Sequence, residues 1–326
     1  MRRRDFIKGI AGSATGWPLA AHAQQASKIA RIGFLGSTFA SPWGSRVEAF
    51  RSGLRDLGYV EGDNIAIEFR WAEEKYDRLA DLAAELVRLK VDVLVTYGTP
   101  GSLVAKSATT TIPIVMVHSG DAVAAGIVAS LARPGGNLTG MTYFLPELMA
   151  KRIEMLKDVI PSISQVAIPV KPDNAFFRTA LRGLQAPTQS LNVTLQQIAM
   201  PGPNDFADAF ATMAKNDVDA FVILEDAVFV SNARAIADLA VKQRLPSAGF
   251  SEYAEAGALI GYGIDFIDMY RRAGVFVDKI LKGVKPADIP IEQATKFVTM
   301  INMRTAKALS LSVPSSLIVR ADEVIE

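Results

Sequence analysis

The sequence predicts an α/β protein with two doubly wound parallel-sheet lobes joined by a hinge that the chain crosses several times. Short apolar runs alternate with longer amphipathic stretches from residue 31 onward, which is typical of βαβ units in a parallel sheet. The same alternation starts again after about residue 145. Without a predicted export signal, 303 residues remain, enough for two ordinary domains.

The first unit alternates strands and helices. Apolar residues at helical spacing follow the first run and end before Gly58, which favours a helix that stops there. Pro113 lacks a backbone N–H, so we place it near the start of its strand. The predicted strands are residues 32–35, 65–69, 91–95, 112–117 and 138–141, and the predicted helices are residues 47–57 and 79–89.

The second unit repeats this pattern. Its predicted strands are residues 166–170, 193–198, 218–224 and 259–262, and its predicted helices are residues 145–159, 177–184, 206–214 and 233–242. A helix at residues 269–281 and a strand-helix pair at 297–309 follow, and we expect at least one of them to return to the first unit. The predicted lobes are residues 24–143 plus about 266–292, and residues 144–265 plus about 293–326, with a ligand cleft between them.

The first 23 residues have the features of an export signal. A basic head with Arg3 and Arg4 precedes a mildly apolar stretch and the sequence Ala21-His22-Ala23, a small-x-small cleavage site. The arginine pair with the following residues resembles the twin-arginine pattern. An ordinary signal and an uncleaved anchor are the alternatives. We expect a soluble periplasmic protein.

Composition narrows the chemistry. Removing residues 1–23, with four basic residues and one acidic residue, leaves a formal net charge of −2, which gives no electrostatic case for nucleic acid. The chain has no cysteine, so it has no disulfide, no thiolate nucleophile and no cysteine for a lipid anchor. Phosphate-loop and dinucleotide motifs are absent from the sequence, and we expect no cofactor and no metal.

Histidine is almost as scarce. The chain has two histidines, and one lies in the predicted signal, so a catalytic triad or a histidine-rich metal site would depend on His118 alone. His118 follows an apolar strand. It is either a satisfied, partly buried histidine or a ligand contact.

Polar and aromatic residues follow the predicted strands, at the edge where open α/β sheets bind ligands. We expect Thr99, Ser119 and Gly120 to bind a carboxylate or polar head, since both of their loops are expected to lead into helices whose free N–H groups favour anions. Acids would bind an ammonium or hydroxyl group, and aromatic rings the ligand body. The acids are Asp121, Glu225 and Asp265, and the rings are Tyr97, Tyr143 and Tyr262. Helix capping, a solvated helix start and core packing are the alternatives.

Several blocks of sequence carry a family resemblance. Gly58-Tyr59-Val60-Glu61-Gly62 and Arg133-Pro134-Gly135-Gly136-Asn137 are two of them, and others are residues 31–36, 108–115, 270–274, 280–288, 295–297 and 320–326. They closely resemble the bacterial ABC-transporter substrate-binding proteins of the tryptophan-binding-like family. The resemblance implies a type I periplasmic-binding fold, ligand capture between lobes, and delivery to a membrane permease with its ATPase.

The sequence departs from that family's usual pattern at Tyr97 and in the loops at residues 36–43 and 171–174, which makes these loops candidates for ligand contact. The resemblance therefore supports the fold better than an aromatic amino acid as ligand. We expect a solute-binding protein that makes and breaks no bond, binds an amino-acid-like molecule or small carboxylate, and meets the membrane only through the permease.

Two alternatives to transport stay open. One is a periplasmic ligand-sensing domain for a membrane receptor. The other is an exported hydrolase that uses Glu225 and Asp226 as acid and base.

Overall fold

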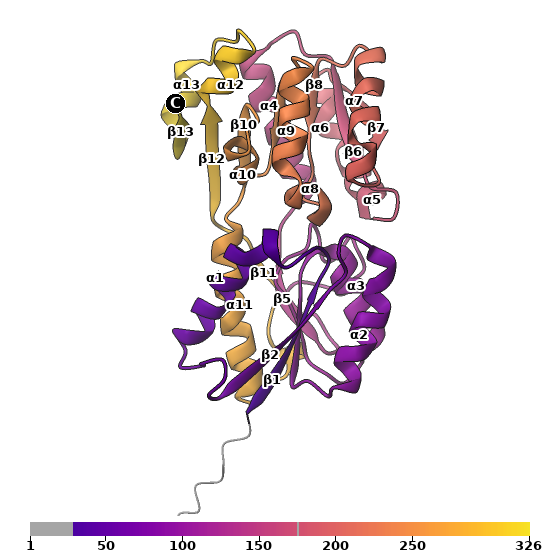
Figure 1. Ribbon diagram of the computed structural model, residues 1–326, viewed down its shortest axis with the longest axis vertical. Helices are drawn as coiled ribbons and strands as arrows, with labels where there is room; N and C mark the ends of the chain where they lie inside the picture. Colours follow the sequence, from indigo (N-terminus) through magenta and orange to yellow (C-terminus); the bar gives the residue numbers. More distant parts are fainter. Residues whose placement is uncertain (1–28, 175) are drawn as a thin grey trace, which may run out of the picture.

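The computed structural model describes residues 29–174 and 176–326, and the predicted export signal lies outside the described residues. Within that part, the strands form two separate sheets, one in each of two α/β lobes stacked along the long axis of the molecule (Figure 1). The mixed α/β class and the two-lobe arrangement agree with the sequence prediction.

The first sheet has the strand order β11-β5-β4-β3-β1-β2, and all of its pairs are parallel. Its strands are β1 (Ala30–Gly36), β2 (Ile65–Trp71), β3 (Val93–Thr96), β4 (Ile114–Met116), β5 (Leu138–Thr142) and β11 (Glu292–Gln293). Its helices are α1 (Gly44–Arg55), α2 (Leu79–Arg88), α3 (Gly98–Ala108) and α11 (Phe266–Leu281).

Alternating side chains of this sheet enter two different cores. Phe34 packs in the core that includes Phe50 of α1 and Phe276 of α11. The next residue, Leu35, packs with Leu86 of α2 on the other side. Helices therefore cover both faces, as the doubly wound prediction requires.

The second sheet has the order β13-β12-β10-β9-β8-β6-β7. Its strands are β6 (Gln165–Val170), β7 (Thr194–Ala199), β8 (Ala220–Val222), β9 (Ser247–Gly249), β10 (Ile260–Ile264), β12 (Phe297–Asn302) and β13 (Glu323–Ile325). Its helices are α4 (Leu145–Val159), α5 (Phe176–Gly183), α6 (Gln185–Ser190), α7 (Phe206–Lys215), α8 (Ala227–Ser231), α9 (Ala233–Lys242), α10 (Ser251–Glu255), α12 (Met303–Ala308) and α13 (Ser315–Arg320).

This sheet corrects the prediction in two places. Strand β12 runs antiparallel to β10, so the second sheet is mixed rather than wholly parallel. Strand β9 was not predicted, because Ser247, Ala248 and Gly249 carry no large apolar side chain and its register is set only by its neighbours β8 and β10.

Two late segments return to the first lobe. Strand β11 pairs with β5 in that lobe, and the next strand, β12, pairs with β10 in the other. Helix α11 crosses α1 at backbone contact: a Cβ atom on Gly53 would lie 2.0 Å from the carbonyl oxygen of Arg271. On this basis we propose the lobe limits given above.

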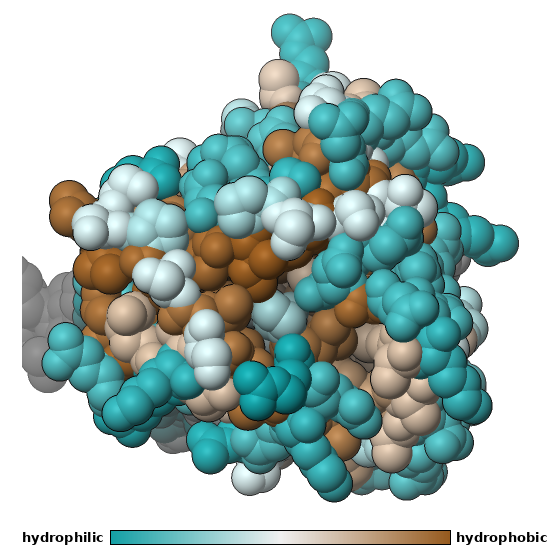
Figure 2. Space-filling view, turned by 90° about the horizontal axis from the view of Figure 1, so that it is seen from above, coloured by the Kyte–Doolittle hydropathy of each residue, from teal (hydrophilic) through white to brown (hydrophobic). Residues whose placement is uncertain are grey.

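The end face of the second lobe has polar side chains around an apolar area (Figure 2). In residues 29–174 and 176–326, none of the helices combines the length and the apolar content that crossing a membrane requires.

Candidate functional site

A cleft between the lobes lies at the carboxyl ends of strands from both sheets, the edge at which open α/β sheets bind ligands. The space between its lining atoms, including the gaps between side chains and the open solvent at its mouth, amounts to about 550 Å³. Strands β1, β3, β4 and β5 lead into it from the first lobe, and β6 and β8 from the second. Its lining includes Ser37, Trp43, Arg46, Tyr76, Tyr97, Thr99, His118, Gly120, Tyr143, Asn174, Phe176, Phe177, Glu225, Asp226 and Phe266.

One part of the lining is an aromatic cluster formed by Trp43, Tyr97, His118 and Phe266. The rings of Trp43 and Tyr97 are stacked with centroids 4.8 Å apart, and those of His118 and Phe266 are 4.9 Å apart. The guanidinium carbon of Arg46 lies 4.8 Å from the Trp43 ring and 5.2 Å from the Phe266 ring. The cluster offers flat apolar surfaces next to one cation.

Tyr97 is fixed within this cluster by its hydroxyl group. The backbone N–H of Ser37 donates to the Tyr97 oxygen at 3.0 Å, and the Thr38 hydroxyl lies 3.2 Å from it. Burial raises the pKa of Tyr97 to about 12, although these hydrogen bonds act in the opposite direction. The phenol therefore stays neutral.

His118 is 5% exposed, and neither ring nitrogen has a hydrogen-bond partner among the residues that the structure describes. Of the two alternatives, a histidine satisfied by other described residues is not what the structure contains. Burial, with a smaller contribution from Arg46, lowers the pKa of His118 to about 3. A neutral imidazole, with one donor and one acceptor, thus forms part of the cleft wall.

The second lobe contributes a buried acid, Asp226, which is 1% exposed. Its Oδ1 accepts a hydrogen bond from the Val228 N–H at 2.9 Å and caps α8. Its Oδ2 accepts from the Tyr76 hydroxyl at 3.0 Å and from Asn174 Nδ2 at 2.9 Å. Burial raises the pKa of this carboxyl, while the three donors oppose the rise. The sequence analysis gave a solvated helix start as an alternative role for the acids. Asp226 does lie at a helix start, but it is buried rather than solvated.

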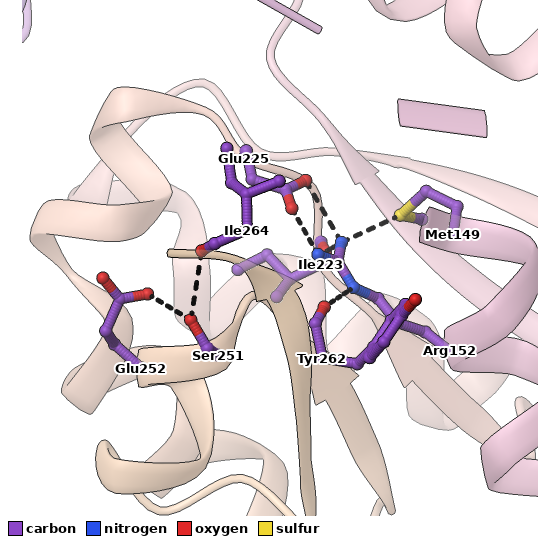
Figure 3. A network of polar contacts seen from close by, with 8 residues as sticks. All are labelled: Met149, Arg152, Ile223, Glu225, Ser251, Glu252, Tyr262 and Ile264. Atoms are coloured by element: carbon purple, nitrogen blue, oxygen red, sulfur yellow. Dashed lines mark hydrogen bonds and ion pairs between the residues drawn. The ribbon is translucent and has the colours of Figure 1, made fainter. Parts of the chain in front are cut away.

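The adjacent acid, Glu225, forms an ion pair with Arg152 of α4, and the two side chains are 1% and 0% exposed. Figure 3 shows the guanidinium facing both carboxylate oxygens, with Nη1 donating to Oε2 at 3.1 Å. The same guanidinium also donates to the carbonyl oxygens of Tyr262 at 2.8 Å and Ile223 at 3.1 Å. Arg152 thus holds Glu225 against the sheet edge.

Five of the residues expected to contact a ligand line the cleft: Tyr97, Thr99, Gly120, Tyr143 and Glu225. Thr99 lies in the first turn of α3, as expected from the helix predicted after that loop. The other four expected residues do not line the cleft: Ser119, Asp121, Tyr262 and Asp265.

Each of those four has a local structural contact. The Ser119 hydroxyl lies 3.2 Å from that of Thr142. Asp121 Oδ1 accepts from the backbone N–H groups of residues 123 and 124, and these residues form turns rather than the expected helix. Asp265 caps α11 and pairs with Lys296 at 2.7 Å, whereas the Tyr262 ring stacks on Phe297.

Sequence reasoning gave no ligand role to Arg46, Tyr76, Phe176 or Phe266, all of which line the cleft. Two other lining residues, Trp43 and Asn174, lie in the loops where the sequence departs from the family pattern. The departure from the family pattern was therefore the sequence signal that could have identified these two residues as ligand contacts. In the described part of the chain, no group of three or more histidine, cysteine or acidic side chains could hold a metal ion.

Two α/β lobes with a cleft between the carboxyl ends of their strands are characteristic of two-lobed solute-binding proteins. The family model described as "ABC transporter substrate binding protein" matches residues 44–325. The chain belongs to this family, and it is a substrate-binding protein of the ABC-transporter type.

Known proteins agree with this assignment. A protein of Clostridioides difficile named "Tyrosine-binding protein" is 27% identical over 265 residues, which cover 81% of this chain and 76% of that protein. A Streptococcus pneumonia ABC domain solved with L-Trp is 25% identical, with a TM-score of 0.82, covering 90% of this chain and all of the other. A conserved domain protein of Vibrio cholerae has the same fold, at 24% identity, a TM-score of 0.85, and coverage of 91% and 100%.

Proposed function

We propose that this protein is the periplasmic solute-binding component of an ABC importer, and that it binds an amino acid with an aromatic side chain. The observation that carries the proposal is the pairing, in one interlobe cleft, of a buried carboxylate with an aromatic cluster. The names of two relatives, one tyrosine-binding and one solved with L-Trp, support this ligand class.

Asp226 is the proposed partner of the ligand ammonium group. It is buried, and no lysine or arginine of the described chain forms an ion pair with it. Buried Lys171 acts on it only electrostatically, since the Lys171 ammonium pairs with Asp173 at 2.8 Å. A ligand ammonium in direct contact would therefore complete the ion pairing and hydrogen bonding of this buried carboxylate. Tyr76 and Asn174 hold Oδ2 in place.

The ligand carboxylate is proposed to bind at the start of α3, a helix of 11 residues. In its first turn the Gly98 N–H donates to the His118 carbonyl and Pro100 has no N–H, so Thr99 and Gly101 supply the remaining backbone donors. The helix dipole favours a negative charge there. The hydroxyl groups of Ser37 and Thr99 line the cleft and have no hydrogen-bond partner among the described residues. The ring of the ligand would then pack in the aromatic cluster.

Among the described residues, three hydrogen bonds join the lobes around the cleft. Tyr76 donates to Asp226, Asn232 Nδ2 donates to Glu74 Oε1 at 2.9 Å, and Arg46 pairs with Glu252 at 2.9 Å. With the lobes held together by these hydrogen bonds, a ligand in the cleft would be enclosed. Opening of the hinge would release it to the permease, whose ATPase drives import.

The contacts of Glu225 and Asp226 also bear on the hydrolase alternative. Glu225 pairs with Arg152, and Asp226 accepts three hydrogen bonds, an arrangement that favours binding over the acid and base roles of a hydrolase. A permease and an ATPase encoded beside this gene would support import, whereas a histidine kinase would support the sensor alternative.

The test is calorimetry on the purified protein with a panel of amino acids and small carboxylates. We expect saturable binding and a higher melting temperature with at least one aromatic amino acid, since ligand bound only by the folded state stabilises it. The variant Asp226→Asn should bind it more weakly. The matched control Glu154→Gln, which removes an exposed ion pair on α4, should bind normally. No binding across the panel would contradict the proposal.

Periplasmic location is tested separately. Residues 1–23 fused to a reporter should export it. Replacing Arg3 and Arg4 with lysine should abolish export if the twin-arginine route is used and leave it intact if the general route is used.

A further inference from the structure

His118 has a feature that the proposed function does not use. Its imidazole is 5% exposed and lines the cleft, yet Nδ1 and Nε2 have no partner among the described residues. A buried polar group without a hydrogen bond is unfavourable. Such a group in a binding cleft favours a ligand that supplies the missing partner.

The surrounding rings hold the imidazole in place. The ring centroids of Tyr97, Tyr143, Phe266 and Tyr270 lie 5.9, 6.1, 4.9 and 6.0 Å from that of His118. The backbone carbonyl of His118 also accepts a hydrogen bond from Gly98 N–H at 2.9 Å. The side chain is thus enclosed on several sides by rings, and its backbone is tied to the start of α3.

The chemistry of the neutral ring defines its partner. A neutral imidazole has one unprotonated nitrogen, which accepts a hydrogen bond. The neighbouring rings form an apolar, flat environment, which favours a donor that is carried by a ring packed beside them. A phenol O–H and an indole N–H both meet this condition, and an unsubstituted phenyl ring does not.

We infer that His118 accepts a hydrogen bond from an O–H or N–H group on the ring of an aromatic amino acid, and so selects tyrosine or tryptophan over phenylalanine. The inference rests on the proposed function and names the residue that discriminates within its ligand class. A site built to hydrogen-bond a substrate group rejects the analogue without it, because its own polar atom is then left unpaired.

The first experiment measures the affinities of L-Tyr, L-Trp and L-Phe by calorimetry in the full chain and in two variants. His118→Phe keeps a ring but removes both nitrogens, and His118→Gln keeps a donor and an acceptor. We expect the unmodified protein to bind tyrosine or tryptophan roughly 10- to 100-fold more tightly than phenylalanine. His118→Phe should bring this ratio close to one, because tyrosine and tryptophan lose their hydrogen-bond acceptor, and His118→Gln should retain part of it.

The second experiment needs no change at His118. The chain has two histidines, so a full chain with His22→Gln and no histidine tag carries a single imidazole for 15N NMR. Saturating L-Tyr or L-Trp should shift the resonance of one ring nitrogen, and saturating L-Phe should not. This measurement decides the question if His118→Phe fails to fold.

An unchanged affinity ratio in His118→Phe, or equal nitrogen shifts with all three ligands, would overturn the inference but leave the proposed function intact. Binding of only non-aromatic solutes would overturn the inference and the proposed ligand class, leaving solute capture. Absence of any binding would overturn both.

Discussion

Arg152 and Glu225 form a buried ion pair at the cleft, with side chains 0% and 1% exposed, while the next residue, Asp226, pairs with neither lysine nor arginine in the described chain. The two adjacent acids therefore have different electrostatic roles. Glu225 has its cation within the protein, whereas Asp226 forms no direct ion pair and interacts only electrostatically with Lys171, which itself pairs with Asp173.

Replacing Arg152 with methionine should destabilise the protein strongly, because it leaves the Glu225 carboxylate buried without its cation. Breaking a buried pair in this way lowers the free energy of unfolding by about 3–5 kcal/mol. Urea unfolding measures it. The double variant Arg152→Met/Glu225→Gln should lose less than Arg152→Met alone, and an equal or greater loss would contradict this account.

Asp226 should make ligand affinity sensitive to acid. The bound ammonium needs the ionised carboxylate, so affinity should fall as the pH falls through the pKa of Asp226. Burial raises that pKa above its usual value of 3.8, so the fall should begin at a higher pH than for an exposed aspartate. Calorimetry from pH 7 to 4 measures it. Asp226→Asn should bind roughly 10- to 100-fold more weakly at pH 7 and should lose the acid dependence, which would persist if another group were responsible.

His118 should make folding sensitive to pH in a different range. Its pKa is 6.5 in an unfolded chain and about 3 in the folded protein, so below pH 6.5 the unfolded state binds a proton that the folded state does not. Stability is therefore fully present above pH 6.5 and should decline on acidification by about 1.4 kcal/mol per pH unit. Urea unfolding at pH 7.5, 6.0 and 5.0 measures this decline.

His118→Phe is the matched variant for that measurement. It should lose this contribution while the acidic groups titrate as before, so the difference in stability between the two proteins should change with pH. A difference that stays constant between pH 7.5 and 5.0 would show that the histidine is protonated equally well in the folded state.

The Arg46 to Glu252 pair should favour the closed arrangement of the lobes. Its side chains are 9% and 30% exposed, and partly exposed pairs of this kind contribute about 0.2–1 kcal/mol. Glu252→Gln should therefore weaken ligand binding by up to about fivefold, chiefly through faster dissociation, as stopped-flow fluorescence can show. The effect should shrink in 1 M salt, and Glu154→Gln should show none.

The alternation of apolar runs was enough to place most strands and helices. Helix α4 has the predicted bounds, because its pattern depends only on the spacing of nearby side chains. The same reasoning gave no signal for β9, whose three small residues are in a strand only because β8 and β10 lie on either side.

Candidate site residues were predicted from their place after strands, and this rule works for Tyr97 and Glu225, which line the cleft. It cannot tell a side chain that points into the cleft from one that bonds to its own neighbouring backbone. Asp121 accepts hydrogen bonds within a turn, and Asp265 caps α11. Arg46 lies on a helix rather than after a strand, so the rule could not find it.

By itself, the sequence determined the α/β class, the two units and the family, since these depend on patterns carried by neighbouring residues and long matching blocks. Only the tertiary structure decided which acid forms an ion pair and which ring nitrogens lack partners among the described residues. Arg152 and Glu225 are 73 residues apart, and Tyr76 and Asp226 are 150 apart. Contacts over such separations depend on how the sheets and lobes pack, which no local spacing records.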